Sequence, residues 1–270
     1  MRRETFQTPG PLTLELDMPA GEIQVQAGER SETIVELETS SGREEVHQAI
    51  SEARIEVRPR GEGQAVVVDV RPRRRFGLTF DRGEITMRVT CPFDAGVELS
   101  TASADVVLRG RLGGLHAELA SGDLRAEEQN GRVEVKSASG DVVLEVIGGD
   151  ASVATASGDL YVRSVHGEAM LRSASGDVRV DEAADSLTIQ TASGDQRVGS
   201  VTAGRITLQS ASGDQQVGIR RGSAAHLDVR TMSGDATSEL EVRDAPVDPS
   251  APLVELRATS MSGDIRIVRA

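Results

Sequence analysis

The tripeptide Ser-Gly-Asp recurs along the chain and sets out a column of carboxylates at nearly constant spacing. Its aspartates are Asp123, Asp141, Asp159, Asp177, Asp195, Asp214, Asp235 and Asp264, and a Ser-Ala-Asp variant ends at Asp105. Successive steps from Asp105 are 18, 18, 18, 18, 18, 19, 21 and 29 residues. Five identical steps indicate an 18-residue internal repeat with insertions that grow toward the C-terminus.

Carboxylates stacked in this way could bind calcium, as in nonapeptide β-rolls whose turns read Gly-Gly-x-Gly-x-Asp. In this chain Gly directly precedes Asp, Gly-Gly-x-Gly is absent, and the second turn of the repeat has no fixed Asp. We therefore expect all nine aspartates to be structural turn residues, because Gly permits a positive φ and Ser and Asp side chains bind backbone groups of the turn. Calcium binding is kept as a lesser alternative.

A column of carboxylates repels itself unless backbone N–H groups or cations hold each charge. Arg179, Arg197 and Arg266 each follow a column aspartate by two residues. Side chains two apart on a strand point to the same face, so we expect these arginines to supply part of the compensation.

Other chemistry has little support in the residues. Polysaccharide-cleaving β-helices use carboxylates on a sheet and aromatic sugar platforms, but this repeat is monotonous and its only tyrosine is Tyr161. The four histidines show no metal-ligand or triad spacing, and Cys91 beside Pro92 is interpreted as a buried small residue. We expect no cofactor, no metal and no enzyme activity, with a polysaccharide-active enzyme as a lesser alternative.

Alternation of apolar and polar residues predicts two short strands and two turns in each repeat. Val142 and Leu144 fall on one side of the first strand, whereas Tyr161 and Arg163 of the next repeat fall on the other. Such a hairpin cannot bury a face alone, so identical units must stack. The prediction is an all-β solenoid of 18-residue coils, with two strands per coil in two facing parallel sheets. Sheets this close require small side chains, which accounts for only five aromatic residues in 270.

The less regular first part, residues 1–99, is expected to form a β-rich cap with degenerate coils, and residues 100–270 the solenoid. The pattern from Ser41 to Glu44 resembles a capping box and predicts one helix at about 42–53. Strands are expected at about 54–60 and 65–71.

One basic and apolar segment departs from the acidic average of the chain. It contains Arg71, Arg73, Arg74, Arg75, Phe76 and Phe80. Its composition suits contact with a partner or an anionic membrane surface, or alternatively a solvated hairpin end whose phenylalanines fill the cap.

The net charge of −13 argues against nucleic-acid binding, which depends on neutralising phosphates. No apolar run has the length of a signal peptide or a transmembrane segment. These features lead us to expect a cytoplasmic protein, with a location peripheral to the membrane as the alternative.

The Ser-Gly-Asp repeats, and the segment from Ile85 to Pro92 that leads into them, resemble the bacterial putative-adhesin family of repeat domains. The resemblance covers nearly the whole chain and implies a β-solenoid and an adhesin-like role. It transfers no catalytic residues.

We therefore expect a non-enzymatic binding or scaffold protein that engages an unknown protein or envelope component through its flat sheet faces. The alternative is a structural protein that self-assembles into filaments through its C-terminal coil. That alternative requires Ile265 and Ile267, after Asp264, to form an uncovered edge.

Overall fold

The computed structural model of the chain describes residues 1–70, 85–240 and 251–270. The chain divides into two compact units, Met1–Gly140 (unit 1) and Asp141–Ala270 (unit 2). The boundary between residues 99 and 100 that the sequence suggests stays a prediction.

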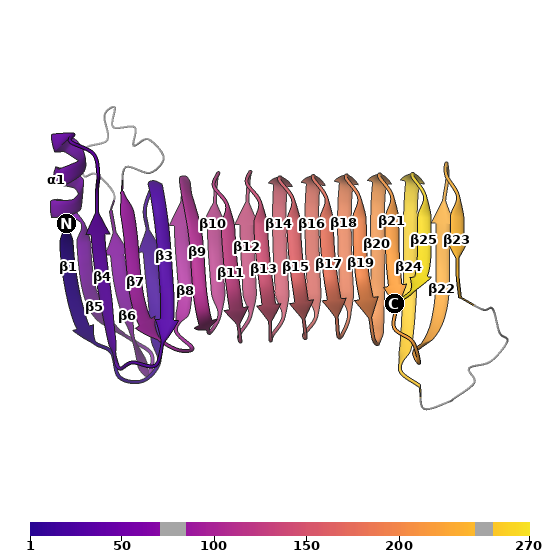
Figure 1. Ribbon diagram of the computed structural model, residues 1–270, viewed down its shortest axis with the longest axis horizontal. Coiled ribbons are helices and arrows are strands. Elements are labelled where there is room, and N and C mark those ends of the chain that lie inside the picture. The colour runs from indigo at the N-terminus through magenta and orange to yellow at the C-terminus, as the bar shows by residue number, and fades with distance from the viewer. Residues whose placement is uncertain (71–84, 241–250) are drawn as a thin grey trace. The chain divides into compact units, whose positions relative to one another are not determined.

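Unit 2 consists of stacked coils that each contribute one strand to each of two sheets (Figure 1). The first sheet contains β13 (Val142–Ile147), β15 (Leu160–Val165), β17 (Val178–Ala183), β19 (Gln196–Val201) and β21 (Gln215–Ile219). The second contains β14 (Ala151–Ser157), β16 (Ala169–Ser175), β18 (Leu187–Ser193) and β20 (Gly204–Ser212). Neighbouring strands are parallel, and Leu160 pairs with Val178 one repeat later. The predicted solenoid of 18-residue coils is confirmed.

The last two coils of unit 2 do not stack in chain order. They contain β22 (Ala224–Thr231), β23 (Ala236–Ser238), β24 (Leu253–Ser262) and β25 (Ile265–Arg269). Strand β24 lies between β20 and β22, and β25 lies between β21 and β23, as the yellow strands of Figure 1 show. The uncovered edge after Asp264 that the filament alternative requires is not found, because β23 covers β25 and both Ile265 and Ile267 are buried.

Small aliphatic side chains and a column of hydroxyls fill the space between the sheets of unit 2. Val142, Leu144, Leu160 and Val162 are all buried. At the corner that precedes Ser-Gly-Asp, the inward residue is Ser or Thr, and in several coils its hydroxyl donates to the carbonyl two residues later. Examples are Thr155 to Ser157 at 2.9 Å, Ser210 to Ser212 at 2.8 Å and Ser260 to Ser262 at 3.0 Å. In these coils the bond lets a hydroxyl lie in the core without losing its hydrogen bond, whereas the buried Ser173 hydroxyl has no partner among the described residues.

Unit 1 combines parallel coils with antiparallel strands. Its strands are β1 (Arg2–Gln7), β2 (Leu12–Asp17), β3 (Ala20–Gly28), β4 (Glu32–Glu38), β5 (Arg54–Arg60), β6 (Gly63–Asp69), β7 (Thr86–Pro92), β8 (Gly96–Thr101), β9 (Ser103–Leu112), β10 (Leu115–Leu119), β11 (Leu124–Gln129) and β12 (Val133–Ser137). The order β1-β4-β7-β3-β9-β11 forms one sheet, and β5-β6-β2-β8-β10-β12 the other. The strands β1, β4 and β7 are antiparallel neighbours, as are β5 and β6. The two outermost strands, β1 and β5, therefore close their sheets with a pattern different from that of the coils.

The expected helix is present as α1 (Glu44–Glu52), which buries Val46, Ala49 and Ile50. The predicted capping box is wrong, because Arg43 occupies the N-cap position and makes no side-chain capping bond. At the other end, the Arg2 guanidinium donates to the carbonyls of Ile50, Ser51 and Ala53 at 3.2, 3.1 and 2.6 Å. Arg2 thus satisfies carbonyls that the end of a helix leaves without partners. In the part of the chain that the structure describes, no helix is both long and apolar enough to cross a membrane.

Candidate binding face

Hydrogen bonds from one coil to the next hold the aspartate column. In each unit, Oδ1 of an aspartate accepts the backbone N–H of the aspartate in the adjacent coil. The donor and acceptor pairs are Asp123 to Asp105 (3.0 Å), Asp159 to Asp141 (2.9 Å), Asp177 to Asp159 (2.9 Å), Asp195 to Asp177 (2.8 Å), Asp214 to Asp195 (2.9 Å), Asp264 to Asp214 (2.8 Å) and Asp235 to Asp264 (2.9 Å). Backbone donors thus stabilise the charges in the column. Among the described residues no group of three or more His, Cys, Asp or Glu side chains could hold a metal ion.

The glycine of each Ser-Gly-Asp corner allows adjacent corners to approach closely. Gly176 has φ +126°, and a Cβ atom there would lie 2.2 Å from the carbonyl oxygen of Gly158 in the coil below. Only glycine has both the conformational freedom and the small size that this corner requires.

The basic segment singled out in the sequence, Arg71 to Phe80, lies outside the described residues. Its proposed contact with a partner or a membrane surface therefore stays a prediction.

Two of the arginines expected to compensate the column aspartates, Arg179 and Arg197, contact other groups. Tyr161, Arg179, Arg197, Gln216 and Arg266 are register partners on β15, β17, β19, β21 and β25, and we call them the arginine row. All five lie on the outer face of the first sheet of unit 2, where the three arginines are exposed. The sequence placed these arginines on one face, but it linked them to the column rather than to one another.

One end of the arginine row is a hydrogen-bonded cluster around Asp181. The Tyr161 hydroxyl donates to Asp181 Oδ2 at 2.5 Å, and Arg179 Nε donates to Oδ1 at 2.8 Å. The Arg179 guanidinium also lies 5.6 Å from the centroid of the Tyr161 ring. Partial burial raises the pKa of Asp181, but the bonds from Tyr161 and Arg179 outweigh it, and the pKa is lowered overall. The bond to Asp181 raises the pKa of Tyr161, which therefore stays protonated and donating.

The other end of the row contains cations that have no carboxylate partner in the part of the chain that the structure describes. Arg197 donates to the neutral amide of Gln216 at 3.3 Å. Among the described residues, neither Arg197 nor Arg266 forms an ion pair. By contrast, Arg163 beside the row pairs with Glu145 at 2.7 Å. The row therefore presents two guanidinium groups without an ion pair among the described residues, on a chain whose net charge is strongly negative.

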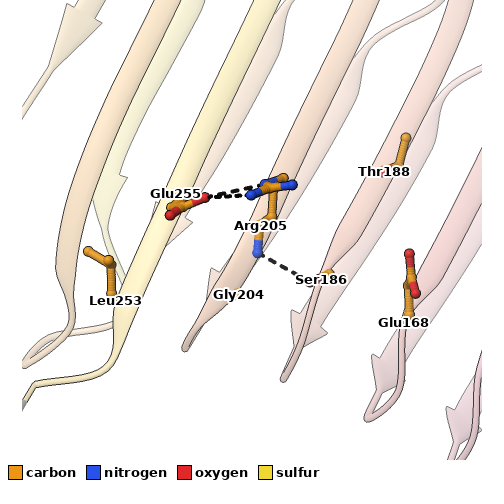
Figure 2. Close-up of a pocket in the computed structure, with 7 residues that line it drawn as sticks. All are labelled: Glu168, Ser186, Thr188, Gly204, Arg205, Leu253 and Glu255. Carbon is orange, nitrogen blue, oxygen red and sulfur yellow. Dashed lines mark hydrogen bonds and ion pairs between the residues drawn. The ribbon is translucent and has the colours of Figure 1, made fainter.

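A shallow hollow lies on the second sheet of unit 2 and encloses about 360 Å³. Its lining consists of Glu168, Ser186, Thr188, Gly204, Arg205, Leu253 and Glu255 (Figure 2). Arg205 donates to Glu255 through Nε and Nη2 at 3.2 and 3.1 Å, and its backbone N–H donates to the Ser186 hydroxyl at 3.3 Å. Arg205 is the only cation in this lining, and it already pairs with Glu255. The hollow is therefore a weaker candidate for binding an anion than the arginine row.

Cys91 on β7 is fully buried, and desolvation raises the pKa of its thiol to about 12. The thiolate that a nucleophile requires is therefore scarce at neutral pH. This geometry suits the small core residue that the sequence suggested.

Comparison with known proteins places the repeats in a family. Residues 115–268, more than half of the chain, match the family model described as Toastrack DUF4097. The chain belongs to the Toastrack DUF4097 family. Among curated proteins, no significant match to this Toastrack chain is found.

Solved structures similar to this Toastrack chain have low sequence identity to it. A putative adhesin from Bacteroides fragilis is 11% identical, with a TM-score of 0.50 over 99% of this chain and 96% of that one. A putative adhesin from Parabacteroides merdae is 13% identical, with a TM-score of 0.46 over 99% and 96% of the two chains. The Bacteroides structure supports the fold described above.

Proposed function

We propose that this chain is a non-enzymatic, adhesin-like binding protein that holds a carboxylate-bearing polysaccharide along the arginine row. The observation that carries the proposal is the pair of exposed guanidinium groups, Arg197 and Arg266, without carboxylate partners among the described residues. The names of the structural neighbours support an adhesin-like role for those proteins and raise the same expectation here.

The chemistry of the row suits an acidic polymer. A guanidinium group presents a planar fork of donors that matches a carboxylate, and such charge-assisted bonds are stronger than neutral ones. Arg179 and Arg197 lie on adjacent strands, about 4.8 Å apart in the sheet direction. Arg266 lies two strands beyond Arg197, so the cations repeat along one line across the coils. A polymer with repeated carboxylates can engage several of them at once, which raises its overall affinity.

The test is calorimetric titration of the protein with polygalacturonate, and with dextran as the neutral polymer. We expect binding of polygalacturonate that weakens with salt, and little binding of dextran. Replacing Arg197 and Arg266 together with Gln should weaken polygalacturonate binding about tenfold or more, a loss of at least ~1.4 kcal/mol.

The opposite sheet provides a matched control. Arg172 on β16 is exposed and donates to Gln190 in the adjacent coil at 3.1 Å, as Arg197 does to Gln216. Arg172→Gln should therefore leave binding unchanged. Equal losses in the two variants, equal binding of dextran, or preferred binding of single-stranded DNA would refute the proposal.

A further inference from the structure

Unit 2 ends in two strands whose outer edges have no partner in the described part of the chain. β22 pairs only with β24, and β23 pairs only with β25. The N–H groups of Ala224 and Met232 donate to Pro252 and Ser260 on the side of β24, at 2.9 and 3.2 Å. Because the bonded residues of a parallel strand alternate, the odd-numbered residues from 225 to 231 direct their N–H and C=O groups toward the open edge. Such an edge is a template for another strand.

Apolar side chains gather at the same end of unit 2. Met232 is 83% exposed and Met261 58%, at a corner position where earlier repeats have alanine. Together with Leu253, they are three of the five exposed large hydrophobic residues in the described part of the chain. Leu227 and Val229 of β22 are only partly covered, although they occupy inward positions. Unpaired backbone and exposed apolar groups at one end indicate a contact surface.

The charged side chains of β22 are complementary to those of a second copy of β22 that runs antiparallel to it. His226, Asp228 and Arg230 point outward, and Asp228 bonds to Arg230 within the strand at 3.0 Å. We propose that β22 pairs antiparallel with β22 of a second copy of this chain, with Val229 on the two-fold axis. In this register the odd-numbered residues exchange backbone hydrogen bonds. Asp228 then lies directly across from the partner's Arg230, in the non-bonded pairs where side chains approach most closely.

The same two-fold axis, perpendicular to both sheets of unit 2, sets β23 beside its own copy. Pairing therefore uses both open edges at once and produces a closed dimer rather than a filament. Strand β5, the outermost strand of one sheet of unit 1, offers no equivalent surface, since it contains Pro59 and exposed Arg54, Arg58 and Arg60. Proline and charge on an edge strand oppose further pairing.

Light scattering coupled to size-exclusion chromatography tests the proposal over a range of concentrations. The wild-type chain should have twice the monomer mass of 28.6 kDa. Arg230→Asp and Asp228→Arg should each be monomeric, because each places like charges across the two-fold axis. Mixing the two variants should restore a dimer. Positions 228 and 230 are both acidic in Arg230→Asp and both basic in Asp228→Arg. Every facing pair in the mixed dimer therefore has opposite charges.

Arg172→Asp is the control, because it reverses an exposed charge on the second sheet far from β22 in the strand order. It should leave the dimer mass unchanged, and circular dichroism should show that all variants fold. A monomeric wild type, a mass that grows without limit with concentration, or a mixture of the two variants that stays monomeric would each overturn the proposal.

Discussion

The Oδ1 atom of Asp214 accepts the backbone N–H of Asp264 at 2.8 Å, although 50 residues separate the two in the chain. Asp264 in turn accepts the N–H of Asp235 at 2.9 Å. The aspartate column therefore continues through the end of unit 2 in the order in which the coils stack, and not in the order in which they occur in the sequence.

The column predicts a difference between two substitutions of Asp177. Asp177→Ala removes the acceptor of the Asp195 N–H and should destabilise the fold by about 1 kcal/mol. Asp177→Asn retains an Oδ1 acceptor and should remain close to the wild type. Urea titrations followed by circular dichroism measure both, and equal midpoints for Ala and Asn would show that the bond contributes nothing.

The close approach of adjacent corners predicts that Gly176→Ala is severely destabilising, by more than about 3 kcal/mol. The new Cβ would combine a disfavoured φ with an overlap against the Gly158 backbone. Gly222 is the matched control: its φ is +92°, but nothing lies within 4 Å of a Cβ there. Gly222→Ala should cost only the backbone strain, about 1–2 kcal/mol. Thermal unfolding would contradict this account if both variants lost the same stability.

We expect that replacing the buried Gln129 will stabilise the protein. Its side chain is 1% exposed, and neither amide atom has a hydrogen-bond partner among the described residues. Leu112 pairs with it in register and is also buried. Gln129→Met keeps an unbranched side chain and removes the unsatisfied amide, so it should stabilise the protein by about 1–3 kcal/mol.

Gln196 supplies the comparison for that measurement. Its Nε2 donates to Thr191 and to the Gln209 carbonyl, both at 2.8 Å. Gln196→Met should therefore be neutral or destabilising. A Gln129→Met variant with a lower melting temperature than the wild type would show that its amide is satisfied in solution.

We expect Asp94 to contribute to the loss of stability of the fold in acid. Hydrogen bonds from Arg111 are the main cause that lowers the pKa of Asp94 from its usual 3.8, and Asn130 adds to them. A carboxylate whose pKa is lowered by folding stabilises the folded state above the unfolded pKa, and this contribution is lost as pH falls through the folded value. Asp94→Asn should therefore destabilise the protein at neutral pH, and the difference should shrink below pH 3.8.

Asn is the appropriate replacement because Asp94 has φ +61°, a conformation that Asn tolerates. Urea midpoints at neutral and acid pH measure the effect. A difference between the two proteins that stays constant across this range would exclude the ion pair as its source.

Much of the fold follows from the repeat itself. The steps of 18 residues predict the coil, the alternation around Val142 and Leu144 predicts the inward face, and the glycine of each Ser-Gly-Asp predicts the corner. The arginine row was only partly predictable: the pattern placed Arg179, Arg197 and Arg266 on one face, but it did not identify the partner of Arg179 on the same strand or that of Arg197 in the neighbouring coil. Among the described residues Arg197 bonds only to Gln216, because its register partners on the two adjacent strands are the cation Arg179 and the neutral Gln216.

The sequence by itself determined the unit of this protein, because period, alternation and turn residues are local properties of the chain. Only the tertiary structure decided the order of the last coils. Every coil presents nearly the same parallel edge, so local pattern does not distinguish whether β21 pairs with β23 or with β25. Pairing with β25 buries Ile265 and Ile267 and leaves the polar β23, Ala236–Ser238, at the exposed edge. That choice lowers the apolar surface exposed to water, and it can be evaluated only when all the coils are stacked together.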